Sequence, residues 1–212
     1  MAKRSRSFFE SLAEIWFPIP CARCGAVGGS PCARCLEDLQ PADRIEALPP
    51  LDQIVALVRY DETSRPFIAD LKYRGVWASA RVLGPAMAAL IEESFGDETA
   101  DLTLTWAPTT PRRVRDRGFD QAEVLAREIG HRSNLRVERL LERVAGPAQT
   151  GRSRSERAHG VAFIPTRSIS GPVIVIDDVV TTGATFGAAG RALFDAGSSS
   201  VVAIALAATP EH

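Results

Sequence analysis

The segment from Val173 to Thr185 constrains the fold of this 212-residue chain more than any other. It consists of four β-branched residues (173–176), the acids Asp177 and Asp178, two valines, and a Thr-Thr-Gly-x-Thr sequence. A β-branched run of this kind is typical of a strand buried on both faces of a parallel sheet. Ligands of such sheets bind beyond the carboxyl ends of the strands. We therefore expect the chain to leave the sheet at residues 176–178 and to present both acids there.

The Thr-Thr-Gly-x-Thr sequence that follows favours a phosphate-binding loop. Gly183 allows the backbone to approach an anion closely and to adopt a positive φ. A helix is expected from about Thr185 to Ala196, ended by Gly197, and its N-terminus would face the anion. The two acids can accept hydrogen bonds from sugar hydroxyls or bind Mg²⁺. Together these features predict a pocket for a ribose that carries a 5′-phosphate. The alternative is that the acids only cap a turn.

The same segment resembles the signature of type I phosphoribosyltransferases. The resemblance implies an α/β fold, with a parallel sheet flanked by helices, and a site for phosphoribosyl pyrophosphate (PRPP) with Mg²⁺. It implies that Asp177 and Asp178 hold the ribose hydroxyls and are the catalytic pair of an enzyme. It implies that the 5′-phosphate is held by Thr181, Thr182, Gly183, Ala184 and Thr185, and that Val179 and Val180 before them belong to the same ligand site. The other common phosphate motifs, G-x-x-x-x-G-K-[ST] and G-x-G-x-x-G after a strand, are absent from the sequence.

Four cysteines lie close together near the start of the chain. They form two C-x-x-C pairs, Cys21 with Cys24 and Cys32 with Cys35, and the sequence contains no other cysteine. Two such pairs supply the four thiolates of a closed, structural zinc site. Free thiols, a degenerate site and an iron–sulfur cluster are the alternatives. A ribbon this short has too little core to fold alone, so the metal would supply its folding energy.

Length and composition predict one main domain with a small appendage. We expect an N-terminal helix and zinc ribbon over residues 1–45 and a phosphoribosyltransferase-like domain over residues 46–212. Apolar residues at 8, 9, 12, 15 and 16 have helical spacing and are interrupted by Glu10 and Glu14, which argues against a secretory segment. No stretch of about 18 apolar residues predicts a membrane span. A cytoplasmic location is expected.

Basic residues are distributed unevenly along the chain. Lys72 is the only lysine beyond Lys3, and residues 112–157 hold 12 Arg against 7 Asp and Glu. A strand over residues 102–106 is expected to run into a Pro/Arg-rich loop, which places Arg112 and Arg113 at the same sheet edge as the phosphate loop. We assign these arginines and Lys72 to the pyrophosphate of PRPP. The alternative for the arginines is a solvated basic surface, and the alternative for Lys72 is an exposed lysine that is retained by chance.

Asp120 and Glu123 then predict a capped helix that ends at Gly130. A second basic loop spans residues 149–157, and the alternative for this loop too is a solvated surface.

Several of these pieces occur in an order similar to that of the ComF family, which includes the GntX-type proteins. They are the cysteine ribbon, the sequences Leu71-Lys72-Tyr73-Arg74-Gly75 and Arg117-Gly118-Phe119-Asp120-Gln121, Gln149-Thr150 followed by Arg157, and the phosphoribosyl loop. The family usually has Asn at the position of Asp120, and residues 158–163 also depart from its pattern. The resemblance implies a role in competence and DNA uptake.

Two functional hypotheses stay open at this point. The first is a phosphoribosyltransferase that binds PRPP with Mg²⁺ and releases pyrophosphate to an acceptor that the sequence does not identify. The second is a non-catalytic competence factor that binds single-stranded DNA, or a competence helicase, and keeps the phosphoribosyl pocket for regulation.

Overall fold

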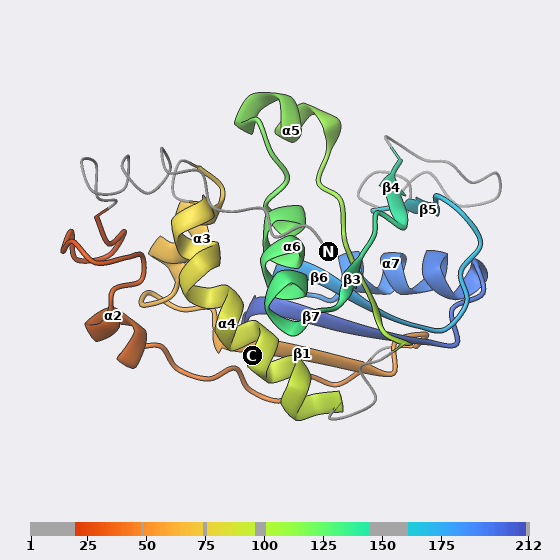
Figure 1. Ribbon diagram of the computed structural model, residues 1–212, viewed down its shortest axis with the longest axis horizontal. Helices are drawn as coiled ribbons and strands as arrows, with labels where there is room; N and C mark the ends of the chain where they lie inside the picture. Colours follow the sequence, from red (N-terminus) through yellow and green to blue (C-terminus); the bar gives the residue numbers. More distant parts are fainter. Residues whose placement is uncertain (1–19, 48, 74–75, 96–100, 145–160, 211–212) are drawn as a thin grey trace.

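A computed structural model of the chain describes residues 20–47, 49–73, 76–95, 101–144 and 161–210 (Figure 1). The elements follow one another as α2 (Ala33–Glu37), β1 (Gln53–Arg59), α3 (Arg65–Leu71), α4 (Val76–Phe95), β2 (Thr103–Trp106), α5 (Pro111–Arg117), α6 (Gln121–Ser133), β3 (Arg136–Val137), β4 (Leu141–Arg143), β5 (Phe163–Pro165), β6 (Pro172–Val180), α7 (Ala184–Asp195) and β7 (Ser200–Ala208). The expected N-terminal helix and the basic loop 149–157 lie outside the described residues.

The centre of the molecule is a five-stranded sheet in the order β1-β7-β6-β2-β3. All its neighbouring strands are parallel, and β6 is paired on both sides, with β2 and β7. Strands β4 and β5 form a separate antiparallel pair. The predicted α/β class with a parallel sheet flanked by helices is therefore confirmed.

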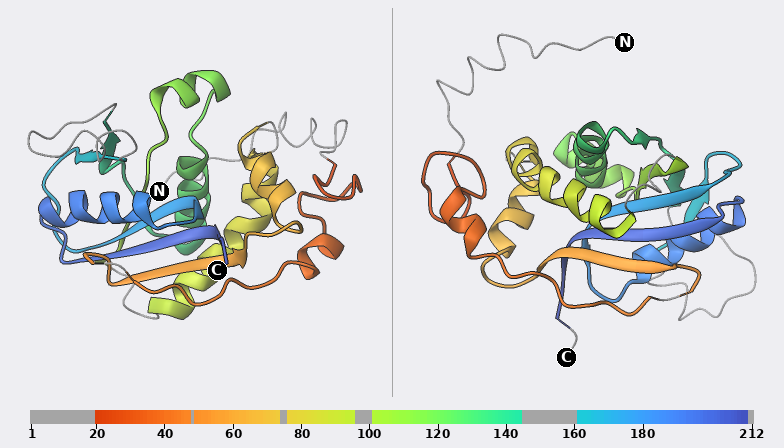
Figure 2. Two further views of the ribbon diagram at one scale, coloured as in Figure 1. Left: turned by 180° about the vertical axis from the view of Figure 1, so that it is seen from behind. Right: turned by 60° about the horizontal axis from the view of Figure 1, so that its bottom comes forward.

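Helices cover both faces of this sheet. Helices α4 and α6 pack on one face, and α7 packs on the other (Figure 2). The first residues of β6 alternate between the two cores, with Ile174 and Ile176 in one and Val173 and Val175 in the other. All four are at most 1% exposed, as the β-branched run predicts for a doubly covered strand.

Strand β6 is longer than expected. The chain does not leave the sheet at residues 176–178, because β6 continues through both acids to Val180. The reason is that β7 is equally long and offers a pairing partner along the whole strand, from Pro172 opposite Ser200 to Val180 opposite Ala208. The two acids are consequently held by the ladder of a central strand and not by a turn.

The Pro/Arg-rich segment after β2 is helical and not a loop. Helix α5 begins after Thr110, whose hydroxyl accepts a hydrogen bond from the Arg113 N–H, and it has Pro111 at its first position. It ends at Gly118, which has a φ of 85°. Figure 1 shows α5 standing away from the sheet, joined to it by the segments that lead from β2 and into α6.

Helix α6 begins after Asp120, as predicted, but does not end at Gly130. It continues to Ser133, and Asn134 then takes the left-handed conformation with a φ of 54°. Gly130 is needed inside the helix because a Cβ there would lie 2.1 Å from Cγ2 of Val137 on β3. The glycine marks a close approach of helix and strand, not a helix end.

The cysteine-containing segment docks beside α3 at one end of the sheet. Cys21, Cys32 and Cys35 share a small apolar cluster with Phe67 of α3, and residues after α2 run along β1, where Pro41 bridges Val58. The boundary expected at residue 45 stays a prediction. Among the residues that the structure describes, no helix is both long and apolar enough to cross a membrane.

Candidate functional site

Asp178 lies at the centre of a polar network formed by three separate helices and strands. Its side chain on β6 is 11% exposed, and its Oδ2 lies 3.3 Å from Nζ of Lys72, at the end of α3. The same oxygen accepts a hydrogen bond of 3.4 Å from Nε2 of Gln121 on α6. Gln121 in turn accepts a hydrogen bond from Arg117. Lys72 and Gln121 thus share one oxygen of Asp178.

Asp177 has a different environment. Its Oδ1 accepts the Asp178 backbone N–H at 2.8 Å. Burial, and then the charge of Asp178, raise the pKa of Asp177 well above the usual range of an aspartate. A hydroxyl donor or a cation that binds beside this carboxyl would favour its charged form and so lower its raised pKa. The two acids therefore differ in their partners: Asp178 contacts side chains of other elements, and Asp177 accepts a backbone N–H of its own strand.

The loop after β6 has the geometry of a helix N-terminus open to solvent. Gly183 has a φ of 70° and precedes α7, which begins one residue before the expected Thr185. Thr181 and Thr182 are exposed, and residues 179–186 line a hollow of about 40 Å³. The first N–H groups of a helix have no partner within it, and the helix dipole adds a partial positive charge. The loop can therefore bind an anion.

Asp120 connects α6 to the segment that follows β2. Its Oδ2 accepts the Thr109 N–H at 2.8 Å, and its Oδ1 accepts the Ala122 N–H at 3.1 Å. Burial raises the pKa of Asp120, and these backbone N–H groups oppose that effect. Both oxygens are in use, and this explains why Asp suits the position where the resembling family usually has Asn, which has only one acceptor oxygen.

Replacing Asp120 by Ala is expected to lower the free energy of unfolding by about 2 kcal/mol, since it removes a helix cap and leaves the buried Thr109 N–H without its acceptor. Asp120→Asn should lose about half of that, because one oxygen remains. Urea denaturation measures both changes. Asp116→Ala is the matched control, because Asp116 is exposed on α5 and its ion pair with Arg112, at 3.8 Å, is exposed to solvent. Equal stability of Asp120→Ala and the control would contradict this role.

The basic residues assigned to pyrophosphate lie in two places. Lys72 reaches the acid pair directly. Arg112 and Arg113 lie on α5 and are exposed, and Arg112 has 86% of its side chain in solvent. The role of the two arginines stays a prediction.

Arg143 is a candidate residue that the sequence did not indicate. It lies on β4, and its guanidinium donates to the Pro108 carbonyl at 3.3 Å and lies 5.6 Å from the centre of the Phe163 ring. Burial, and then Arg113, lower the pKa of Arg143, whereas Asp177 raises it. This arginine therefore lies within electrostatic reach of both the acid pair and α5. The sequence carried no signal for it, because an isolated Arg in a short strand has no motif.

Arg143 also borders a cavity of about 460 Å³. The cavity lies between the segment after β2, α5 and β4, and its lining includes Trp106, Thr109, Val114, Arg115, Asp120 and Arg139. This volume is in the range of small-molecule sites, about 300–1,000 Å³. Lys72 thus contacts Asp178, whereas Arg143, which borders this cavity, is within electrostatic reach of Asp177.

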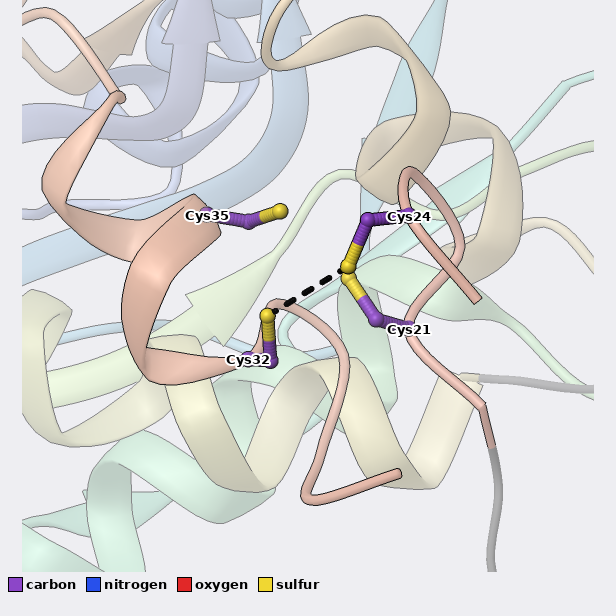
Figure 3. Close-up of side chains that lie close together, drawn as sticks. All are labelled: Cys21, Cys24, Cys32 and Cys35. Atoms are coloured by element: carbon purple, nitrogen blue, oxygen red, sulfur yellow. Dashed lines mark hydrogen bonds between the residues drawn. The ribbon is translucent and has the colours of Figure 1, made fainter. Parts of the chain in front are cut away.

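The four cysteines converge as their spacing predicts (Figure 3). Their sulfur atoms all lie within 4.8 Å of one another, and the Sγ atoms of Cys24 and Cys32 are 3.6 Å apart. Four thiolates around one tetrahedral zinc, with Zn–S bonds of about 2.3 Å, have sulfurs about 3.8 Å apart. Burial, and then contacts with the other cysteines, raise the pKa of Cys35 to about 12, so the group needs a cation to hold four thiolates. The donor set fits a structural metal ion.

The parallel sheet, the acid pair on its central strand and the Thr-Thr-Gly-x-Thr loop before α7 form an α/β fold of the kind that the resemblance to type I phosphoribosyltransferases implies. No family model matches the chain. Competence protein ComFC of Streptococcus pneumoniae is 27% identical over 154 residues, which cover 71% of this chain and 66% of that protein. Competence protein ComFC of Bacillus subtilis is 25% identical over 155 residues, covering 72% and 62%. These similarities confirm the resemblance to the ComF family.

The chain spans just under two thirds of the length of these two relatives. A solved structure described as the allosteric regulatory enzyme of purine biosynthesis superposes with a TM-score of 0.42 and 18% identity, over 66% of this chain and 30% of that one.

Proposed function

We propose that the chain binds PRPP with Mg²⁺ at the end of β6. The observation that carries the proposal is the continuity of the site, in which the acid pair, the loop 181–183 and the N-terminus of α7 follow one another along a single segment. Asp177 and Asp178 would accept the ribose hydroxyls, and residues 181–185 would bind the 5′-phosphate. Lys72, with Arg112 and Arg113, would face the pyrophosphate.

Transfer of the phosphoribosyl group would need no nucleophile from the protein. The bond between the anomeric carbon and pyrophosphate breaks, and a bond from that carbon to the acceptor forms, through a transition state that resembles an oxocarbenium ion. Residues of the chain would position the ribose and neutralise the leaving group. Mg²⁺, for which the two aspartates and the pyrophosphate are suitable oxygen donors, would neutralise that group further when bound.

Calorimetric titration of the metal-loaded protein with PRPP and Mg²⁺ tests this proposal. We expect saturable binding of one ligand per chain, and we expect Asp178→Asn to weaken it at least about tenfold, because a hydrogen bond to a charged acceptor contributes about 1.5–3 kcal/mol. Asp195→Asn, at the exposed end of α7, is the matched control and should bind normally. Absence of binding by the folded wild-type protein would refute the proposal.

Zinc is the ion that we infer for the four cysteines, since a closed set of four thiolates is typical of structural zinc. The two relatives are named competence proteins. By extension from them, we propose that the chain acts in DNA uptake, where a competence helicase is a candidate partner.

A second candidate function is binding of single-stranded DNA. The observation that favours it is a pair of exposed aromatic side chains, Tyr73 at 67% and Trp77 at 60%, which closely follow Lys72 in the chain. Aromatic side chains beside cationic ones are the usual platform for unpaired bases. On this hypothesis the phosphoribosyl pocket would serve regulation.

Fluorescence anisotropy with a labelled oligothymidine, measured over a range of salt concentrations, tests the second candidate. If the aromatic pair stacks on bases, Trp77→Ala should cost about 1–3 kcal/mol of binding free energy. The logarithm of affinity should fall with the logarithm of salt concentration, with a slope of about −0.7 for each neutralised phosphate. Phe194→Ala is the control, because Phe194 is similarly exposed, at 54%, but lies on α7. A flat salt dependence would exclude this function.

A further inference from the structure

Helix α3 contacts the cysteine cluster through its first half. Phe67, in the middle of the helix, is 1% exposed and packs in one apolar cluster with Cys21, Cys32 and Cys35. The same ring would lose its neighbours if the metal-binding segment moved. The docking surface of the ribbon is therefore part of a helix that belongs to the main domain.

A chain of hydrogen bonds makes a second, polar connection. The Ala22 N–H, between the first two cysteines, donates to Ser30 Oγ at 3.1 Å, and Ser30 donates to Asp70 Oδ2 at 3.3 Å. Ser79 of α4 donates to the same oxygen at 3.0 Å. Ser30 and Ser79 are both fully buried, at 0% exposure. Buried hydroxyls that converge on one carboxylate fix its position, because each would be costly to leave unpaired.

The other end of α3 leads directly into the candidate site. Lys72 follows Asp70 by two residues and ends the helix, with its N–H bonded to the Ala69 carbonyl at 3.0 Å. Its Nζ lies 3.3 Å from Asp178 Oδ2. Ile68 and Leu71 are buried in the main core, so we expect α3 to stay folded without the ribbon. The ribbon can change the exact position of the helix, and with it the position of the Lys72 ammonium relative to Asp178.

We propose that metal binding at the four cysteines is coupled, through α3, to ligand binding at Asp178, and that Asp70 is the positioning residue of this coupling. The ligand side of this inference rests on the proposed function. Coupling is reciprocal, so the metal strengthens ligand binding by the same factor by which the ligand strengthens metal binding. From the usual size of such couplings we expect a factor of about five or more.

The first experiment needs no phosphoribosyl ligand. Lys3 and Lys72 are the only lysines of the chain, so the acetylation rate of Lys72 can be followed by mass spectrometry, with Lys3 measured in the same sample. Removing the metal with a chelator should raise the rate at Lys72 about fivefold or more. Ser30→Ala should raise it while the metal stays bound. Ser79→Ala removes the bond to the same Asp70 oxygen from α4 and leaves the ribbon's bond in place, so metal removal should still raise the Lys72 rate in this variant.

The second experiment measures zinc affinity by competition with a chelator, with and without saturating PRPP and Mg²⁺. We expect zinc to be held about fivefold more tightly with the ligand present, and Asp70→Asn to reduce that gain while circular dichroism stays unchanged. PRPP can also bind free zinc directly. The same titration with Asp178→Asn, whose PRPP site is weakened, measures the size of that direct effect. If PRPP does not bind at all, the proposed function fails, yet the lysine experiment still decides whether the ribbon positions Lys72. An unchanged Lys72 rate after metal removal would overturn the coupling.

Discussion

Asp177→Asn is expected to produce a protein that is more stable than the wild type and has lost most of its affinity for PRPP. The neutral amide removes the repulsion between two adjacent acids, which together with burial raises the pKa of Asp177. The gain in unfolding free energy should be on the order of 1 kcal/mol, the size that is common when a strained functional group is removed. Binding should fall about 10- to 100-fold, because the amide can neither accept as strongly nor bind a cation.

The pH dependence of stability follows from the raised pKa of Asp177. A carboxyl whose pKa is higher in the folded than in the unfolded state binds more protons when folded, so its contribution to stability is largest at low pH. That contribution declines as the pH rises from about 3.9, the ordinary Asp value, through the raised pKa of Asp177. Asp177→Asn should remove this part of the change of unfolding free energy with pH. PRPP affinity of the wild type should rise over the same interval as Asp177 ionises.

Urea denaturation at a series of pH values, together with calorimetric titration of PRPP, measures both effects. Asp195→Asn introduces the same change at an exposed position of α7 and should alter neither quantity. A destabilised Asp177→Asn variant with normal ligand affinity would show that Asp177 is a structural residue and not part of the site.

Metal removal should have the second large effect, and it should be confined to one part of the molecule. The small cluster of Cys21, Cys32, Cys35 and Phe67 is separate from the two cores of the sheet. The free energy of metal binding is the main folding energy of so small a segment, about 10–16 kcal/mol for isolated zinc peptides at neutral pH. Residues 20–40 should therefore unfold when the metal is removed, while the sheet stays intact.

Hydrogen exchange with and without a chelator localises this effect, and elemental analysis of the purified protein counts the metal. We expect one zinc per chain, and Cys32→Ser should reproduce the chelated state. Restored protection after zinc is added back to the wild type is the control. Protection of residues 20–40 that does not depend on metal would show that apolar contacts with α3 hold the ribbon by themselves.

Local patterns in the sequence predicted the parts of the site that one segment forms. The β-branched run before Asp177 predicts a doubly covered strand, and Gly183 predicts the positive φ that opens α7. These features depend on side-chain shape and backbone preference over a few residues. The same kind of signal was present for α5 in Thr110, Pro111 and Gly118, but the charges between them favoured a loop in our interpretation.

Pairing length could not be predicted from β6 alone. The acid pair favoured a strand that leaves the sheet at residues 176–178, whereas the equally long β7 keeps the ladder intact to Val180. The position of Gly130 inside α6 could not be predicted for a similar reason, because the close approach of Val137 is a contact between different elements.

By itself, the sequence determined that the chain has a cluster of four cysteines, a central apolar strand and a Thr-Thr-Gly-x-Thr loop before a helix, because each of these lies within one short segment whose spacing dictates its geometry. Only the tertiary structure decided which partners surround the acids. Lys72, Gln121 and Arg143 come from three different elements, and the Asp70 link between ribbon and site joins segments far apart in the chain. Such contacts depend on how helices pack against the sheet, and no local preference of the backbone encodes that packing.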